Sequence, residues 1–438
     1  MEIKVHRGLD QIGGCITEIS TATSRVFIDM GQNLPGCGEL TTTEQDRELV
    51  TSLLDANRKK HEAIVYTHAH EDHVGLFEYV YEEIPQHIGE GAKELLVAKY
   101  DLIRKGKELK RNEVLHDIPE LSSSELTEVV AAKEKVEKIK SFKTWKRSSK
   151  PVPFSVGDIR ITPFFNCHSI YDSYMFLIEA DGKRVWHMGD YRKHGYMGKC
   201  LIPTLRKYAI HIDVLITEGT MLGRSDECIH ECIVSKKMSC VMEAFKYVFV
   251  LASATDIERL ASIKEAAKKS NHPLYICSGM MNASMRIFTN REGGFANGLF
   301  SFHPHFYEEG KHLDNMKKKG FCIVAGAGHL DRVLSIYSQL RQEECVLIYS
   351  SWDGYYKRPE QVEIDARYKE FRDAFHNVVD IHTSGHADKQ TIEEVIKTIN
   401  PKEAIIGIHK EKGLELSALN LPEELKSKIH NSYGTSTL

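Results

Sequence analysis

The segment Thr67-His68-Ala69-His70-Glu71-Asp72-His73 restricts the possible folds of this chain more than any other feature of its sequence. It follows the apolar run Ala63-Ile64-Val65-Tyr66, which predicts a β-strand, and it precedes an amphipathic run. We therefore expect the histidines on a loop at the carboxyl end of a strand. Ordinary loop histidines are a poor alternative, because burying several unpaired polar side chains together is costly.

The spacing within this segment indicates a metal site. His68 and His70 are two residues apart, so an extended loop can aim both imidazoles at one ion. Asp72 and His73 are adjacent, at the predicted start of a helix, and can reach a second ion. Mixed imidazole and carboxylate ligands favour Zn²⁺, with Mn²⁺ as the alternative.

The overall composition is typical of a folded protein with two or three domains. Of 438 residues, 42% are hydrophobic, which is enough to form a core. The ten cysteines are scattered and do not resemble a disulfide scaffold. No apolar run approaches the roughly 18–20 residues of a membrane span, and the N-terminus lacks the apolar core of a signal peptide. We therefore expect a cytoplasmic protein with no membrane association.

The charge balance disfavours a general nucleic-acid binder, which is usually basic. The chain has 58 basic and 62 acidic residues and a net charge of −4. The basic residues gather between Lys93 and Lys150. This stretch is either a solvated helical face or a surface that faces phosphates.

The pattern of apolar runs divides the chain into parts. Short strand-like runs dominate up to about residue 217, interrupted by a helical insertion at about 85–150. Asp181-Gly182 predicts a hairpin turn, and residues 44–60 predict a helix. After Glu218, helical runs alternate with short apolar strands, which predicts an α/β layer with parallel strands.

The segment 67–73 resembles the histidine motif of the metallo-β-lactamase superfamily, and the chain resembles that superfamily in three further motifs. Asp29 follows a predicted strand, His168 stands in Asn166-Cys167-His168-Ser169, and Asp190 stands in Met188-Gly189-Asp190. All four motifs occur in the order that the superfamily has.

A second set of motifs is similar to those of the β-CASP nucleases. Leu215-Ile216-Thr217-Glu218-Gly219-Thr220 resembles their motif A, Thr383-Ser384-Gly385-His386-Ala387 their motif B, and His409 their motif C. Motifs A and B are separated by about 160 residues, the size of the β-CASP insertion.

Within that family the chain resembles ribonuclease J most. The run Asn166–Ser173 is similar to the Asn-His-Ser-Ile-Pro-Asp-Ser of ribonuclease J, and Thr255–Arg259 to its Ser-Asn-Ile-x-Arg. Tyr171 replaces the proline, and Asp256 replaces an asparagine expected near phosphate, where an added negative charge weakens phosphate binding. His409-Lys410-Glu411 replaces His-Thr-Glu. Because the sequence ends soon after motif C, we expect no counterpart of the C-terminal domain of bacterial ribonuclease J.

The resemblance implies an α/β fold: a metallo-β-lactamase αββα sandwich of residues 1–218 and 386–438, with an inserted β-CASP α/β domain of residues 219–385. It implies two zinc ions that hold a hydroxide nucleophile. The first has as ligands His68, His70, His168 and Asp190; the second has Asp72, His73, Asp190 and His409.

The remaining residues receive roles from the same resemblance. Asp72, Asp190 and His386 are the predicted catalytic residues, and His386 donates a hydrogen bond to the phosphate or a proton to the leaving oxygen. Asp29 and Glu218 are expected to orient the ligand histidines. Ser384, Thr255 and Arg259 are expected to contact phosphates of the substrate.

The implied activity is hydrolysis of single-stranded RNA, as a 5′–3′ exonuclease, an endonuclease or both. A homodimer is expected because relatives are commonly dimers. Two alternatives remain open at this point: a metallo-hydrolase of small thioesters or lactones, and a β-CASP protein that binds RNA without cleaving it.

Overall fold

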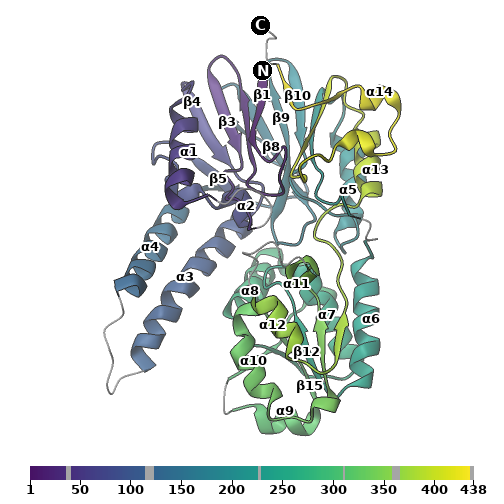
Figure 1. Cartoon of the computed structure of the whole chain (residues 1–438). Coiled ribbons are helices and arrows are strands. Elements are labelled where there is room, and N and C mark those ends of the chain that lie inside the picture. The colour runs from purple at the N-terminus through teal and green to yellow at the C-terminus, as the bar shows by residue number, and fades with distance from the viewer. Residues whose placement is uncertain (36–40, 114–122, 225–227, 309–310, 358–365, 435–438) are drawn as a thin grey trace.

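Two sheets packed face to face form the upper half of the molecule (Figure 1). In this computed structural model, residues 1–35, 41–113, 123–224, 228–308, 311–357 and 366–434 are described. Within them the first sheet has the order β20-β1-β2-β3-β4-β5-β6. Its strands are β1 (Glu2–Arg7), β2 (Ile16–Ser20), β3 (Ser24–Ile28), β4 (His61–Val65), β5 (Gln86–Gly89), β6 (Lys143–Trp145) and β20 (Ser432–Tyr433).

The second sheet has the order β19-β18-β11-β10-β9-β8-β7 over the same described ranges. Its strands are β7 (Phe154–Val156), β8 (Ile159–Asn166), β9 (Ser173–Ala180), β10 (Lys183–His187), β11 (Val214–Glu218), β18 (Ala404–Ile408) and β19 (Ile429–His430). Alternate residues of both sheets meet in one apolar core that includes Val26, Val65, Phe176, Val214 and Ile406.

Helices cover the outer faces of this sandwich. On one side, α1 (Thr43–Asp55) packs on the first sheet through Val50 and Leu54. On the other side, the apolar faces of α5 (Leu201–Tyr208) and α13 (Lys389–Ile399) pack on the second sheet, and the short α14 (Glu423–Lys426) lies beside them (Figure 1). The predicted α/β sandwich flanked by helices is therefore confirmed.

A third sheet lies below the sandwich in Figure 1. All of its pairings are parallel, as the alternation of helices and strands predicts. The order of its described strands is β14-β13-β15-β12-β16-β17. They are β12 (Tyr247–Leu251), β13 (Leu274–Ile276), β14 (His305–Phe306), β15 (Phe321–Ala325), β16 (Cys345–Tyr349) and β17 (Val378–Asp380).

Helices surround the third sheet. They are α6 (Glu231–Ala244), α7 (Ile257–Lys269), α8 (Gly279–Glu292), α9 (Leu313–Lys319), α10 (Leu330–Tyr337), α11 (Gly354–Lys357) and α12 (Arg367–Asp373). The chain enters this unit after β11 and returns to the sandwich at α13. We keep the domain limits 218/219 and 385/386 as a proposal.

The predicted insertion forms two long helices, α3 (Glu90–Glu113) and α4 (Ser123–Lys140), that run side by side (Figure 1). Residues 114–122 between them lie outside the described part of the chain. Some basic groups of this stretch serve the fold, because the Nζ atoms of Lys93 and Lys138 bind backbone carbonyl oxygens.

Local sequence signals explain where several elements turn or end. Asp181 and Gly182 have φ values of 51° and 71°, as a tight hairpin between β9 and β10 requires. The predicted helix 44–60 is shorter than expected, because α1 ends at Asp55 and Asn57 has a left-handed φ of 50°. Among the described residues, we find no helix with the length and apolar character needed to span a lipid bilayer.

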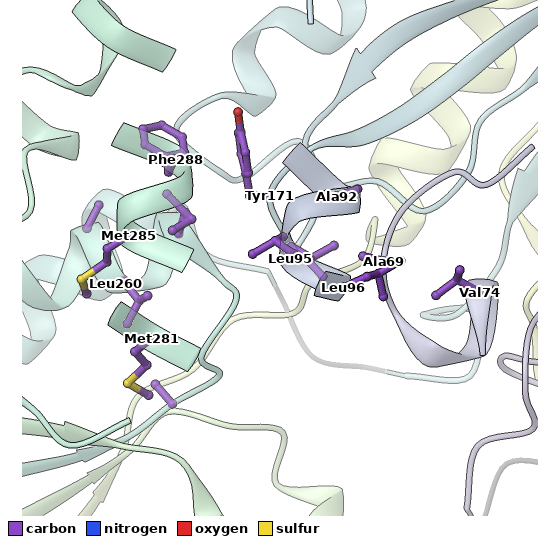
Figure 2. Close-up of a cluster of buried hydrophobic side chains, with 14 of the residues drawn as sticks. Ala69, Val74, Ala92, Leu95, Leu96, Tyr171, Leu260, Met281, Met285 and Phe288 are labelled. Atoms are coloured by element: carbon purple, nitrogen blue, oxygen red, sulfur yellow. The ribbon is translucent and has the colours of Figure 1, made fainter. Parts of the chain in front are cut away.

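An apolar cluster joins the sandwich, the insertion and the third-sheet unit. Figure 2 shows Tyr171 lying between Phe288 of α8 and the start of α3. The rings of Tyr171 and Phe288 are 5.0 Å apart. Leu95 and Leu96 of α3 belong to the same cluster, as do Ala69 within the histidine segment and Val74 directly after it. This packing fixes the third-sheet unit against the side of the sandwich that carries the predicted site.

Candidate metal centre

The predicted site residues meet where six strands of the sandwich end. Each follows, or stands at, the carboxyl end of a strand: Asp29 after β3, His68–His73 after β4, His168 after β8, Asp190 after β10, Glu218 in β11 and His409 after β18. The chain must pack tightly to bring these loops together. A Cβ atom on Gly31 would lie only 1.8 Å from the carbonyl oxygen of Asp72, so this position requires glycine.

Three imidazoles converge at one end of the site. His68 Nε2 lies 3.0 Å from His70 Nδ1, and His168 Nε2 lies 3.2 Å from the same atom. The rings of His68 and His168 are 4.8 Å apart. One nitrogen from each of the three residues could therefore bind the same metal ion.

A second group gathers around the carboxylate of Asp190. Its Oδ2 atom lies 3.1 Å from His73 Nε2, 3.5 Å from His409 Nε2 and 3.7 Å from His168 Nε2. Asp72 Oδ2 lies 3.0 Å from His409 Nε2. Asp190 thus stands between the two imidazole groups, as a carboxylate that bridges two ions must.

The rear nitrogens of three of these rings are held by fixed partners. His73 Nδ1 lies 2.8 Å from Asp29 Oδ2, His168 Nδ1 2.8 Å from the Gly385 carbonyl oxygen, and His409 Nδ1 2.8 Å from Thr220 Oγ1. An N–H donated at the rear leaves the front Nε2 with a free lone pair.

The chemistry of this donor set fits divalent metal ions. His73 Nε2 is buried and makes no hydrogen bond within the described part of the chain. An orphaned imidazole nitrogen beside two carboxylates is costly unless a cation binds it. Cys15 adds a buried thiol near His73 and His409.

Burial and charge act differently on the two groups of imidazoles. Although burial opposes it, the charges of Asp190 and Asp72 raise the pKa of His73 and of His409, so a metal ion must displace a proton there. Burial lowers the pKa of His70 to about 4, and burial together with the neighbouring imidazoles lowers the pKa of His68 and of His168. Although burial opposes it, the charges of His409 and His73 hold the pKa of Asp190 well below its usual range. These three imidazoles are thus neutral and Asp190 is ionised near neutral pH, the forms that bind metals.

His386 lies beside the two groups, and a nitrogen of its ring lies within 4.8 Å of ligand atoms of Asp190, Glu218 and His409. Its Nδ1 atom is 2.9 Å from Glu218 Oε2 and 3.7 Å from Asp190 Oδ2. Its side chain is 20% exposed, whereas that of His409 is 1% exposed. Glu218 also accepts hydrogen bonds from Thr220 Oγ1 and from the backbone N–H of Tyr191, so its carboxylate is rigidly held.

The residues predicted to contact the substrate have different surroundings. Ser384 is half-buried two residues before His386, and its Oγ accepts the His386 backbone N–H. Thr255 is half-buried before α7, with its hydroxyl 3.2 Å from Ser253 Oγ. Arg259 is 2% exposed, and its guanidinium binds Glu231 and the carbonyl oxygens of Ser350 and Thr383. The structure therefore brings Ser384 close to His386 and holds Arg259 inside the protein.

A buried ionic network around Arg192 was not predicted from the sequence. Arg192 binds the carboxylates of Asp256 and Glu258, each at 2.9 Å, and is fully buried. Asp256 also caps α7 by accepting the backbone N–H of Arg259. The charge of Asp256 is thus matched within the protein. The one feature of the sequence that could have indicated this network was the position of Arg192, two residues after Asp190.

Comparison with known proteins agrees with this architecture. The model of the metallo-beta-lactamase superfamily matches residues 35–140. Ribonuclease J of Helicobacter pylori (strain ATCC 700392 / 26695) is 22% identical over 417 residues, which cover 90% of this chain and 54% of that protein. The chain thus spans about half the length of the Helicobacter pylori proteins that it matches.

Two further proteins match almost end to end. An RNase J-like protein of Methanocaldococcus jannaschii is 22% identical over 450 residues, which cover 97% of this chain and 96% of that protein. A crystal structure of a protein of unknown function from Enterococcus faecalis V583 superposes with a TM-score of 0.67 and 18% identity, over 99% of this chain and 96% of that one. The last match shows the fold alone. The chain is thus similar to the metallo-β-lactamase superfamily over residues 35–140 and to ribonuclease J-like proteins along most of its length.

Proposed function

We propose that this protein is a metal-dependent ribonuclease that hydrolyses phosphodiester bonds of single-stranded RNA. The observation that carries the proposal is the convergence of six strand ends on one set of imidazoles and carboxylates. The names of the similar proteins support RNA as the substrate. The completeness of the ligand set supports hydrolysis rather than RNA binding without cleavage.

The site offers ligands for two ions. His68, His70, His168 and Asp190 would hold the first, and Asp72, His73, Asp190 and His409 would hold the second. Zn²⁺ suits this mixture of imidazole and carboxylate, and Mn²⁺ is the alternative. Bound there, two divalent ions would supply a nucleophile from water near neutral pH and would neutralise charge on the phosphate.

His386 is the side chain that, besides the metal ligands, would take part in the reaction. It is the partly exposed imidazole at the rim of the site, and Glu218 fixes its Nδ1 side. The opposite nitrogen, Nε2, is then available to donate a hydrogen bond to a phosphate oxygen or a proton to the leaving oxygen. Ser384, next to it on the same loop, and Thr255 would contact the flanking phosphates. We assign Arg259 to holding that loop in place.

The acidic net charge and the extra charge of Asp256 are the features that favour the alternative of a small thioester or lactone substrate. Arg192 pairs with that carboxylate, so the charge does not act as an unmatched anion against RNA phosphates. The structure thus offers no specific support for this alternative.

The test is cleavage of end-labelled 5′-monophosphate RNA by the protein loaded with Zn²⁺ or with Mn²⁺. We expect the wild type to cleave, and His68→Ala and Asp190→Ala to lose cleavage. His303→Ala, at an exposed histidine outside the site, is the matched control and should cleave like the wild type. RNA binding without cleavage, or unchanged cleavage by Asp190→Ala, would reject the proposal. Mapping the products assigns exonuclease or endonuclease action.

Two further parts of the proposal concern the protein's setting. We infer that it acts on RNA in the cytoplasm and that it forms a homodimer. Light scattering on the purified protein tests the homodimer. We expect a mass of about 100 kDa, twice the 49.9 kDa of one chain. A mass of one chain would reject the dimer.

A further inference from the structure

A second group of metal-binding side chains lies outside the proposed catalytic centre. One ring nitrogen of His194, the Sγ atom of Cys228 and a carboxylate oxygen of Asp388 lie within 4.8 Å of one another. They come from three segments: the loop after β10, the segment before α6, and the N-cap of α13. None of the three belongs to the ligand sets assigned above.

The state of His194 points to a ligand in this cluster. The residue is 8% exposed, and its Nε2 lies 2.7 Å from the carbonyl oxygen of Ser384, to which it can only donate. Nδ1 must then carry the lone pair. That atom is buried and has no hydrogen-bond partner among the described residues. A histidine that donates one N–H to a backbone carbonyl and presents the other nitrogen unprotonated is the usual arrangement of a metal ligand.

We propose that His194, Cys228 and Asp388 form a structural Zn²⁺ site that ties the loop after β10, the start of α6 and the start of α13 together. Imidazole, thiolate and carboxylate are the ligands that zinc uses in proteins, and a water molecule can complete four-coordination. The thiolate disfavours Mg²⁺ and Ca²⁺, which prefer oxygen ligands.

The protonation of the cluster suits metal binding with release of one proton. Burial lowers the pKa of His194 to about 4, so the imidazole is neutral at pH 7. Burial raises the pKa of the Cys228 thiol to about 11, against the opposing effect of hydrogen bonds with Ser384 and Thr383. Without metal the thiol therefore keeps its proton. As the sulfur–zinc bond forms, the S–H bond breaks and the proton passes to solvent.

The position of this cluster gives the metal a structural role. The Thr383–His386 loop passes through it, because the backbone N–H of Ile229 donates to Thr383 Oγ1 at 3.1 Å and His194 binds the Ser384 carbonyl. The same loop orients His168 through the Gly385 carbonyl and carries His386. Zinc at this cluster would hold the loop without contacting the substrate. The inference does not depend on the proposed ribonuclease activity.

The test is a Co²⁺ titration of the metal-depleted full chain, followed by the near-ultraviolet absorption that only thiolate-bound cobalt gives. We expect the wild type to develop this band, with a final intensity that corresponds to one thiolate-bound cobalt ion per chain. Cys228→Ser should lack the band. Asp388→Asn should weaken binding while keeping the helix cap, because asparagine caps helices as well as aspartate does.

Three controls isolate the cluster from other cysteines and from the proposed catalytic centre. Cys240→Ser, at an exposed position on α6, should keep the band. Cys15→Ser and Asp190→Ala alter the other centre and should also keep it. Absence of the band in the wild type, its persistence in Cys228→Ser, or its loss in Cys15→Ser would overturn the proposal.

Zinc content gives a readout that needs no cobalt. The wild type loaded with zinc and dialysed should retain one equivalent per chain more than Asp388→Asn does. If Cys228→Ser does not fold, Asp388→Asn still decides the question. Equal zinc content in the wild type and Asp388→Asn would contradict the site.

Discussion

The Nδ1 atom of His386 lies 2.9 Å from Oε2 of Glu218, although the two residues are 168 positions apart in the chain. Glu218 ends a central strand of the sandwich, whereas His386 lies on the loop by which the chain returns from the third-sheet unit. This contact joins the two parts of the chain at the edge of the candidate metal centre. It also determines which nitrogen of His386 faces the substrate side.

Replacing Glu218 by glutamine should therefore impair catalysis more than metal binding. The amide can donate as well as accept a hydrogen bond, so it can hold the His386 ring in the other tautomer. We expect kcat on RNA to fall by about 10- to 100-fold, with metal content unchanged. Glu415→Gln, at an acidic residue of the loop after β18, is the control. A purely structural role for Glu218 would instead lower the thermal stability and leave the pH profile of kcat unaltered.

Asp29 should control metal affinity through His73. Its Oδ2 atom lies 2.8 Å from His73 Nδ1, and the same carboxylate accepts the backbone N–H and the hydroxyl of Thr67. Asp29→Asn should weaken metal binding by about 10- to 100-fold, as measured by competition with a chelator. Asp55→Asn, at an exposed carboxylate on α1, should leave the affinity unchanged. Equal affinities of Asp29→Asn and the wild type would show that this contact does not tune the site.

Arg192 should be essential for stability because it neutralises buried carboxylates. Its guanidinium is fully buried between Asp256 and Glu258. Arg192→Met leaves those charges unpaired, so we expect a loss of about 3–5 kcal/mol in the free energy of unfolding. Urea denaturation measures it. The added change Asp256→Asn should restore part of the loss.

The neighbouring residue Lys193 is the matched control for Arg192. Its ammonium pairs with Glu394 at the surface, where the lysine side chain is 43% exposed. Lys193→Met should cost less than about 1 kcal/mol, because exposed ion pairs contribute little. Similar losses in the two variants would contradict the account of the buried network.

His87 should make the folded protein sensitive to acid. Burial, with a further contribution from Lys143, lowers the pKa of His87 to about 4. The unfolded chain binds the proton at about pH 6.5, so stability falls as the pH drops through 6.5 and the loss levels off below about 4. Between pH 7.5 and 5 this residue should remove about 2 kcal/mol from the free energy of unfolding.

The variant His87→Phe isolates this effect, because phenylalanine can keep the stacking on Phe154. Its free energy of unfolding should decline less than that of the wild type over the same pH range. Urea denaturation at both pH values measures the difference. Identical declines in the two proteins would show that His87 does not titrate as described.

Local signals were sufficient for much of the fold. Asp181-Gly182 specifies a turn because these residues tolerate positive φ. The position of the histidine segment was also predictable, since a loop that follows an apolar strand lies at the edge of a sheet. The end of α1 was misjudged because helix ends depend on single residues such as Asn57.

The position of the segment 67–73 at the end of a strand could be predicted without the structure, because the spacing of residues along a strand and loop is a local property. Three relationships become visible in the tertiary structure alone. Arg259 donates to Glu231, and Asp256 pairs with Arg192. His194, Cys228 and Asp388 lie close together. These relationships join residues tens to more than a hundred positions apart. They exist because the chain leaves the sandwich after β11, builds the third sheet, and returns at α13 beside the site that it left.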